Sequence, residues 1–195
     1  LKKGESFSTP EVCLTYSADG FSKLSQTLHQ AIVSNLIRSC WKDRVRPILV
    51  NNWEATYFDF NKDNLIAIGK RDDDFSGLGD WFVNEKKLCG TLSELVKEVH
   101  DMGLSFGLWF EPEMISEDSD LYRAHPDWAL VIPGRQPIRS RSQLVLDMSR
   151  EDVTDYLTER ICDIVEKADI QYIKWDMNRS LMAAYSAKLP RDRQG

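Results

Sequence analysis

The sequence predicts an α/β fold built on a parallel sheet. Helical patterns alternate with short β-branched and apolar runs along most of the chain, and several of these runs end in polar or charged residues. This alternation favours right-handed crossovers, and therefore a barrel or a doubly wound sheet. In both architectures chemistry takes place where the strands end at their carboxyl side, so those ends are the first candidates for functional residues.

The composition is that of a folded, acidic protein. The 195 residues are enough for one domain with a core, and 42% of them are hydrophobic. A net charge of −6 without a basic stripe argues against a nucleic-acid partner. There is no run of 18 apolar residues and no signal-peptide pattern, so we expect no membrane partner and a cytoplasmic location. The four cysteines lack metal-ligand spacing and are expected to be reduced thiols.

The first third of the chain predicts two strands and two helices. Residues 11–16 indicate an isolated strand, and residues 22–38 indicate a helix with leucine and isoleucine on one face. The run at 48–50 predicts a short buried strand that ends in asparagines, and residues 61–68 predict a short helix. A long polar stretch, 69–90, then shows no period.

This long stretch interrupts the βα alternation. A structureless loop of more than about 20 residues inside a compact domain argues against a complete βα repeat. We therefore expect that a βα element has been lost near Ile68 and Gly69.

The remaining elements follow in order. Thr91 and Glu94 form a capping box at the start of a helix over 91–102, which ends at Gly103. The segments after it are a strand at 104–110, a short helix at 118–124, strands at 128–132 and 143–147, a helix from a Ser149 cap to Lys167, a strand at 170–173, and a last helix at 178–189.

The strand at 170–173 runs directly into Lys174-Trp175-Asp176-Met177-Asn178-Arg179. Lys174 and Asp176 are two residues apart, so on a strand their side chains point to the same side. A cation there would keep Asp176 ionised and could donate to a sugar hydroxyl, although a structural ion pair is the alternative.

Five blocks of sequence resemble the α-galactosidases of glycoside hydrolase family 36, over roughly residues 11–185. They are Asn51 to Phe58, Gly79 to Phe82, Leu108 to Met114, His125 to Trp128, and Lys174 to Arg179. The resemblance implies a (β/α)8 barrel and retaining hydrolysis of terminal α-galactosides without a cofactor or metal. It assigns Asp176 as the nucleophile, and it assigns the lining of the galactose site to Trp53, Trp109, Arg141, Lys174 and Asn178.

The chain departs from the family pattern in two places. A strand that ends in Asp-Asp-Gly-Trp-Phe is absent before Gly69, which agrees with the lost element. The family's acid/base aspartate lies further along the barrel, and no residue here matches it. The resemblance therefore implies a partial, half TIM-type βα barrel over 21–195, with a short β segment, residues 1–20, from a preceding β domain.

Other polar residues have competing interpretations. Glu111 and Glu113 share a strand end and are expected to support the site rather than to act as an acid/base pair. Trp53 and Trp109 could instead be core residues, and Arg141 could be a solvated charge. The Asp72-Asp73-Asp74 run could bind a cation but is expected to be solvated. For Asp147, before Ser149, a turn or cap role is expected.

Two other function classes stay open. The first is an impaired barrel remnant that self-assembles or binds sugar, favoured by the missing acid. The second is a metal-dependent barrel enzyme with Glu111, Asp147 and Asp176 around a cation. A half barrel would also leave sheet edges open, so we expect a homo-oligomer, a dimer or a tetramer. Its interface would cover partly exposed strand residues: Ile48, Val50, Phe106, Leu108, Ile170, Tyr172 and Ile173.

Overall fold

The computed structural model describes residues 4–57, 75–182 and 184–194. The chain divides into two units, Leu1–Val50 and Asn51–Gly195. The predicted helix at 61–68, the Asp72-Asp73-Asp74 run and the site of the expected strand loss lie outside the described residues. The predicted boundary between residues 20 and 21 stays a prediction.

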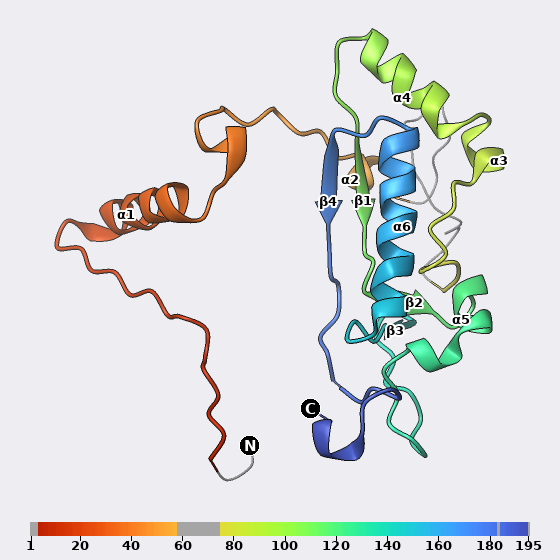
Figure 1. Ribbon diagram of the computed structural model, residues 1–195. Coiled ribbons are helices and arrows are strands. Elements are labelled where there is room, and N and C mark those ends of the chain that lie inside the picture. The colour runs from red at the N-terminus through yellow and green to blue at the C-terminus, as the bar shows by residue number, and fades with distance from the viewer. Residues whose placement is uncertain (1–3, 58–74, 183, 195) are drawn as a thin grey trace. The chain divides into compact units, whose positions relative to one another are not determined.

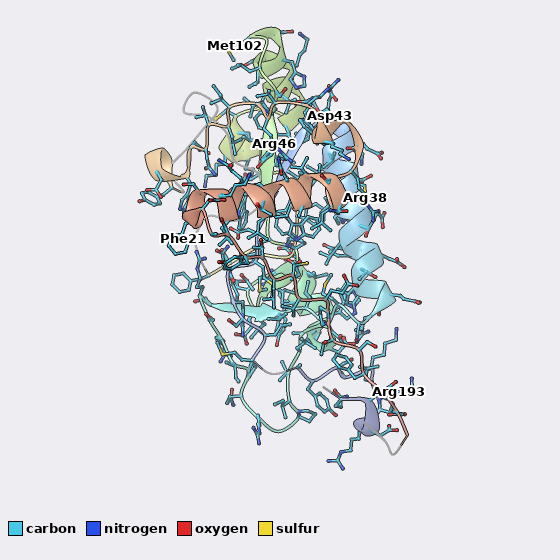
Figure 2. All side chains as sticks on the ribbon, turned by 90° about the vertical axis from the view of Figure 1, so that its left-hand side faces the viewer. Phe21, Arg38, Asp43, Arg46, Met102 and Arg193 are labelled. Carbon is cyan, nitrogen blue, oxygen red and sulfur yellow. The ribbon has the colours of Figure 1, made fainter. Side chains whose placement is uncertain are left out.

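The first unit contains one long helix, α1 (Gly20–Asn35), and a 3-10 turn, η1 (Ser39–Lys42). The helix confirms the prediction for 22–38, although it ends three residues earlier. Figure 2 marks Phe21 at its start and Arg38 beyond its end. No α1 residue is buried. Its apolar face therefore contributes no core to this unit.

The strands expected at 11–16 and 48–50 do not form. A strand needs a neighbour for its N–H and C=O groups, and neither segment has one among the described residues. Ile48 and Val50 are almost fully exposed, at 96% and 87%. The prediction of a buried strand at 48–50 was therefore wrong.

The second unit begins with three short or medium helices. They are α2 (Trp53–Thr56), α3 (Glu85–Leu88) and α4 (Leu92–Asp101). The capping box of α4 is present: the Thr91 hydroxyl accepts from the Glu94 N–H, and the Glu94 carboxylate accepts from the Thr91 N–H. The buried side chains of α4 are Leu92, Leu95, Val96 and Val99. The capping box and the helical period therefore predicted this element correctly.

Strands β1 (Gly107–Phe110) and β4 (Tyr172–Trp175) form a parallel pair, and they lie side by side in Figure 1. Gly107 is opposite Tyr172, and Phe110 is opposite Trp175. A Cβ on Gly107 would come within 2.8 Å of the Tyr172 ring, so glycine permits this close approach. Because the strands are parallel and in register, their carboxyl ends meet at one edge.

A second pair joins β2 (Met114–Ser116), which the sequence did not predict, to β3 (Gln143–Val145) in antiparallel register. Strand β3 confirms the prediction of a strand at 143–147. Helix α5 (Asp120–Ala124) and the 3-10 turn η3 (Pro126–Trp128) lie between them in the chain. The strand predicted at 128–132 was wrong, because only an isolated bridge between Ala129 and Leu146 forms there.

Helix α6 (Glu151–Lys167) precedes β4. It starts after Arg150, so the predicted Ser149 cap was wrong: the Ser149 hydroxyl donates to Asp147 Oδ1 at 2.6 Å instead. Asp147 also accepts the Ser149 N–H at 3.2 Å, which confirms its turn role. Arg150 instead forms ion pairs with Asp127 and Asp152, at 2.7 and 2.8 Å.

The helix predicted at 178–189 does not form among the described residues of that range, and only a 3-10 turn, η4 (Arg191–Arg193), follows. Long-range bonds hold this segment instead. The Asn178 N–H donates to Glu111 Oε1 at 2.8 Å, Arg179 donates to the Ile138 carbonyl at 3.0 Å, and the Ser186 hydroxyl donates to Asp147. These tertiary contacts override a helical pattern of modest propensity.

One hydrophobic core, with members from the 78–88 segment, α4, both strand pairs and α6, holds the second unit together. Phe110, Met114, Ile115, Leu146 and Val153 have no exposed surface. Phe106, Leu108 and Ile170 are at least nine-tenths buried, so the expectation that they would be uncovered was wrong. Tyr172 and Ile173 are 43% and 37% exposed, as expected. No helix in the described ranges is long and apolar enough to cross a membrane.

Candidate active site

The carboxyl end of the β1–β4 pair brings Asp176 to the edge of the sheet. Its backbone N–H donates to the Phe110 carbonyl at 2.9 Å, which continues the parallel ladder one residue beyond β4. The residues after Phe110 and the residues after Trp175 therefore meet at the same place. This is the position where the α/β topology predicted functional groups.

Three donors converge on the Asp176 carboxylate. The Trp109 indole Nε1 donates to Oδ2 at 3.0 Å, and the Asn178 side-chain amide donates to the same oxygen at 3.1 Å. The Met177 backbone N–H donates to Oδ1 at 3.0 Å. Both oxygens are thus oriented by donors from β1 and from the loop after β4.

These donors lower the pKa of Asp176 below the ordinary aspartate value of 3.8. The Trp109 hydrogen bond is the largest cause, while partial burial opposes it. The Asn178 bond, the Met177 N–H and the positive charge of Lys174 then add to the lowering. The prediction that Lys174 would keep Asp176 ionised was correct in sign, but the indole contributes more. A carboxylate that stays ionised at neutral pH is suited to nucleophilic attack.

Glu111 and Glu113, which follow β1, accept hydrogen bonds from residues on either side of Asp176. Glu111 Oε1 accepts the backbone N–H of Asn178 at 2.8 Å, and Glu113 Oε1 accepts the Trp175 indole N–H at 3.0 Å. Glu111 has no exposed surface. These contacts fit a supporting role for the pair, as expected, and not an acid/base pair facing a substrate.

The other predicted sugar-site residues divide into two groups. Trp109, Lys174 and Asn178 lie at the carboxyl ends of β1 and β4, where Asp176 is. Trp53 belongs to α2, is 42% exposed, and has its ring edge-on to Tyr57 at 5.2 Å. Arg141 is exposed in a turn, with φ of 52°. Neither Trp53 nor Arg141 is among the residues that contact the Asp176 carboxylate.

A metal centre has no support in the described part of the chain. No group of three His, Cys, Asp or Glu side chains there is placed to hold an ion. Asp147, one of the carboxylates considered for such a centre, is buried and accepts from Ser149 and from the Ser186 hydroxyl. The four cysteines are free and exposed.

Sequence reasoning missed two residues that support the site. Gln143 is fully buried, and its amide donates to Glu111 Oε2 at 3.2 Å. Arg179 is 8% exposed, donates to the Ile138 carbonyl at 3.0 Å, and donates to the Gln143 carbonyl. A glutamine at the start of the apolar run Leu144 to Leu146 was the available signal, because a buried amide needs partners.

The chain resembles known proteins along its whole length. The Melibiase family model matches residues 6–70 and 67–195. The bifunctional alpha-galactosidase/sucrose kinase AgaSK of Mediterraneibacter gnavus is 49% identical, covering 98% of this chain and 23% of the relative. The alpha-galactosidase AgaA of Geobacillus stearothermophilus is also 49% identical, covering 100% of this chain and 29% of the relative.

The chain is also similar in fold to solved structures of α-galactosidases. A variant of AgaA in complex with stachyose is 48% identical, with a TM-score of 0.90 over 100% of this chain and 30% of that structure. Another AgaA variant, in complex with raffinose, has a TM-score of 0.83 over 87% of this chain. The 195-residue chain thus spans less than a third of the length of the relatives it matches.

The two matched segments of the family model meet at residues 67–70, where the sequence predicted a lost element. The alignment with AgaA runs over 213 positions, which is more than the 195 residues of this chain, so the relative has residues without a counterpart here. The family match, the identity over the whole chain and the similarity to solved structures agree with one another, and the chain therefore belongs to the Melibiase family, whose relatives named here are α-galactosidases.

Proposed function

We propose that the chain is part of a glycoside hydrolase that cleaves terminal α-galactosides with retention, and that Asp176 is its nucleophile. The observation that carries this proposal is the Asp176 carboxylate, held at a strand end by Trp109 and Asn178 with a lowered pKa. The named relatives are α-galactosidases, and variants of one of them, AgaA, are solved in complex with raffinose and with stachyose. Raffinose-type sugars are therefore the proposed substrate class.

The proposed reaction proceeds in two displacements. An Asp176 oxygen forms a bond to the anomeric carbon while the bond to the leaving alcohol breaks, which gives a covalent galactosyl-enzyme. Water then displaces Asp176 and restores the original anomeric configuration. The donors on Oδ1 and Oδ2 hold the carboxylate ionised and oriented for the first step.

The proposed substrate contacts are those that the resemblance assigns. Trp109 and Trp53 would stack on the apolar face of the sugar, and Lys174, Arg141 and Asn178 would donate to its hydroxyls. The position of Trp109, Lys174 and Asn178 at the ends of β1 and β4 supports their assignment. For Trp53 and Arg141 the assignment rests on the resemblance.

A second candidate function is sugar binding without efficient turnover. Retaining glycosidases need a second carboxyl about 5–5.5 Å from the nucleophile. No residue of the 195 matches the family's acid/base, and none of the contacts described for Asp176 involves another carboxylate. Loss of general acid catalysis costs about 10²–10⁴ in rate.

We further propose the half-barrel architecture over residues 21–195, with residues 1–20 from a preceding β domain, and assembly of copies. The parallel β1–β4 pair, with helix α6 between its strands in the chain, supports this proposal, because a barrel of this type is built from βαβ units. Tyr172, Ile173 and Trp175 are 37–56% exposed, and a second copy could cover them. The free, exposed cysteines support a reducing compartment, the cytoplasm.

Turnover of an aryl α-galactoside tests the proposed function. Because nitrophenolate leaves without protonation, the chain is expected to cleave a nitrophenyl α-galactoside faster than raffinose, and Asp176→Asn should remove the activity. Lys188→Ala, an exposed change away from the predicted site residues, is the control. An Asp176→Asn variant as active as the parent would contradict the nucleophile assignment, and a parent that binds galactose without turnover would favour the second candidate.

A further inference from the structure

The segment from Phe110 to Glu113 contacts the chain on both sides of Asp176. The Phe110 carbonyl accepts the Asp176 N–H at 2.9 Å, and Glu113 accepts the indole N–H of the preceding residue at 3.0 Å. Glu111 accepts the backbone N–H of Asn178 at 2.8 Å. The position of the loop that carries Asp176 is therefore set from β1, by three separate hydrogen bonds.

Glu111 is itself held in place. It is fully buried, and its second carboxylate oxygen accepts from the Gln143 amide, which is also fully buried, at 3.2 Å. The Gln143 carbonyl in turn accepts from the buried Arg179. A carboxylate with both oxygens engaged in the interior is a fixed acceptor, because moving it would leave buried donors unpaired.

This fixed acceptor bears on the side chain of Asn178. The amide of that side chain donates to Asp176 Oδ2 at 3.1 Å, beside the Trp109 indole. Whether the Asn178 side chain can reach Asp176 depends on the position of the Asn178 backbone, which its hydrogen bond to Glu111 sets. We propose that Glu111 is a positioning residue, which acts through Asn178 to orient the Asp176 carboxylate. The catalytic meaning of this inference rests on the proposed function, but the positioning itself does not.

Two variants of Glu111 separate the effect of its side-chain length from the effect of its charge. Glu111→Asp keeps the carboxylate but shortens the side chain by one methylene, so the acceptor no longer reaches Asn178. Glu111→Gln keeps the reach and the acceptor but removes the charge. In it, Gln143 Oε1, which is buried without a partner among the described residues, can turn to accept the new amide.

The readout is the pKa of Asp176, measured by NMR on the full chain with ¹³C-labelled aspartate and assigned with Asp176→Asn. Positioning predicts that Glu111→Asp raises this pKa towards 3.8 and that Glu111→Gln does not raise it. A role through charge alone predicts no change for the first variant and a lower pKa for the second. Glu117→Asp, the same change in a surface pair with Arg139, is the control. An unchanged pKa in Glu111→Asp overturns the proposal.

If Glu111→Asp does not fold, hydrogen exchange of the Asn178 amide in the parent chain tests the proposal instead. The Asn178 amide, bound to a buried carboxylate, is expected to exchange about tenfold or more slowly than its intrinsic rate. Exchange at the intrinsic rate overturns the proposal. Neither measurement needs turnover, so an inactive parent would count against the proposed function while the NMR result still decides the role of Glu111.

Discussion

The indole of Trp109 is the strongest single influence on Asp176, so its removal should have a measurable effect that depends on pH. Trp109→Phe keeps an aromatic ring and removes the N–H that donates to Oδ2 at 3.0 Å. A hydrogen bond to a charged acceptor is worth about 1.5–3 kcal/mol when buried, and the partial exposure of Asp176 reduces this to about 1 kcal/mol. For a chain of this size that is a fall of about 2–4 °C in Tm near neutral pH.

The pH dependence separates this bond from lost packing. The pKa of Asp176 is lowered in the folded state, so its contribution to stability is present above the ordinary value of 3.8. That contribution is lost as the pH falls through the lowered pKa. The Tm difference between the parent and Trp109→Phe should therefore be largest near neutral pH and should shrink in acid. Loss of apolar surface, by contrast, would give a difference that does not depend on pH.

Thermal unfolding by circular dichroism over a pH series measures this difference, and Trp175→Phe is the matched control. It removes an indole N–H from the paired strand β4, one that donates to Glu113 at 3.0 Å instead of to Asp176. The pKa of Asp176, from the ¹³C titration, should rise more in Trp109→Phe than in Trp175→Phe, because only the first variant loses a donor to the Asp176 carboxylate. A stability difference independent of pH, or the same pKa in all three proteins, would refute the reasoning.

Four further predictions follow from the same structure. Lys174→Met should raise the pKa of Asp176 less than Trp109→Phe does, because the Lys174 charge contributes least to the lowering. An equal or larger rise for Lys174→Met in the ¹³C titration would contradict this prediction. Thr91→Ala should lower the free energy of unfolding by about 1 kcal/mol through loss of the helix cap, measured by urea unfolding with Lys97→Ala as the control. If Thr91→Ala were as stable as Lys97→Ala, the capping box would contribute nothing. Galactose should bind with a Kd of about 1 mM or weaker, near −4 kcal/mol, and micromolar binding by calorimetry would show a rebuilt site. Light scattering should give a mass above 22.5 kDa, and a well-folded monomer at micromolar concentration would refute assembly.

The sequence predicted the elements whose signals are local. The capping box at Thr91 and the apolar periods of α4 and α6 needed no information from distant residues. The parallel orientation of β1 and β4 followed from the alternation of strand and helix, but the sequence did not predict that these two strands pair with each other. The proposed nucleophile, Asp176, rests on a long block at a strand end that resembles the family, and its role stays a prediction.

The parts that sequence reasoning missed depend on contacts between distant residues. Strand β2 begins two residues after Pro112 and is recognisable only through its pairing with β3. The segment expected to be a helix after Asn178 is held instead by side chains, among them Glu111, which is 67 positions away. The strand predicted at 48–50 does not form, because no strand pairs with it among the described residues. No window of sequence contains such partners.

Covalent trapping tests the central claim most directly. An activated fluorogalactoside, whose fluorine slows release of the glycosyl-enzyme, should label the chain in a one-to-one ratio, and peptide mapping by mass spectrometry should place the galactosyl adduct on Asp176. Asp176→Asn should remain unlabelled under the same conditions. A galactosyl adduct on any other residue, or equal labelling of the parent and Asp176→Asn, would contradict the account.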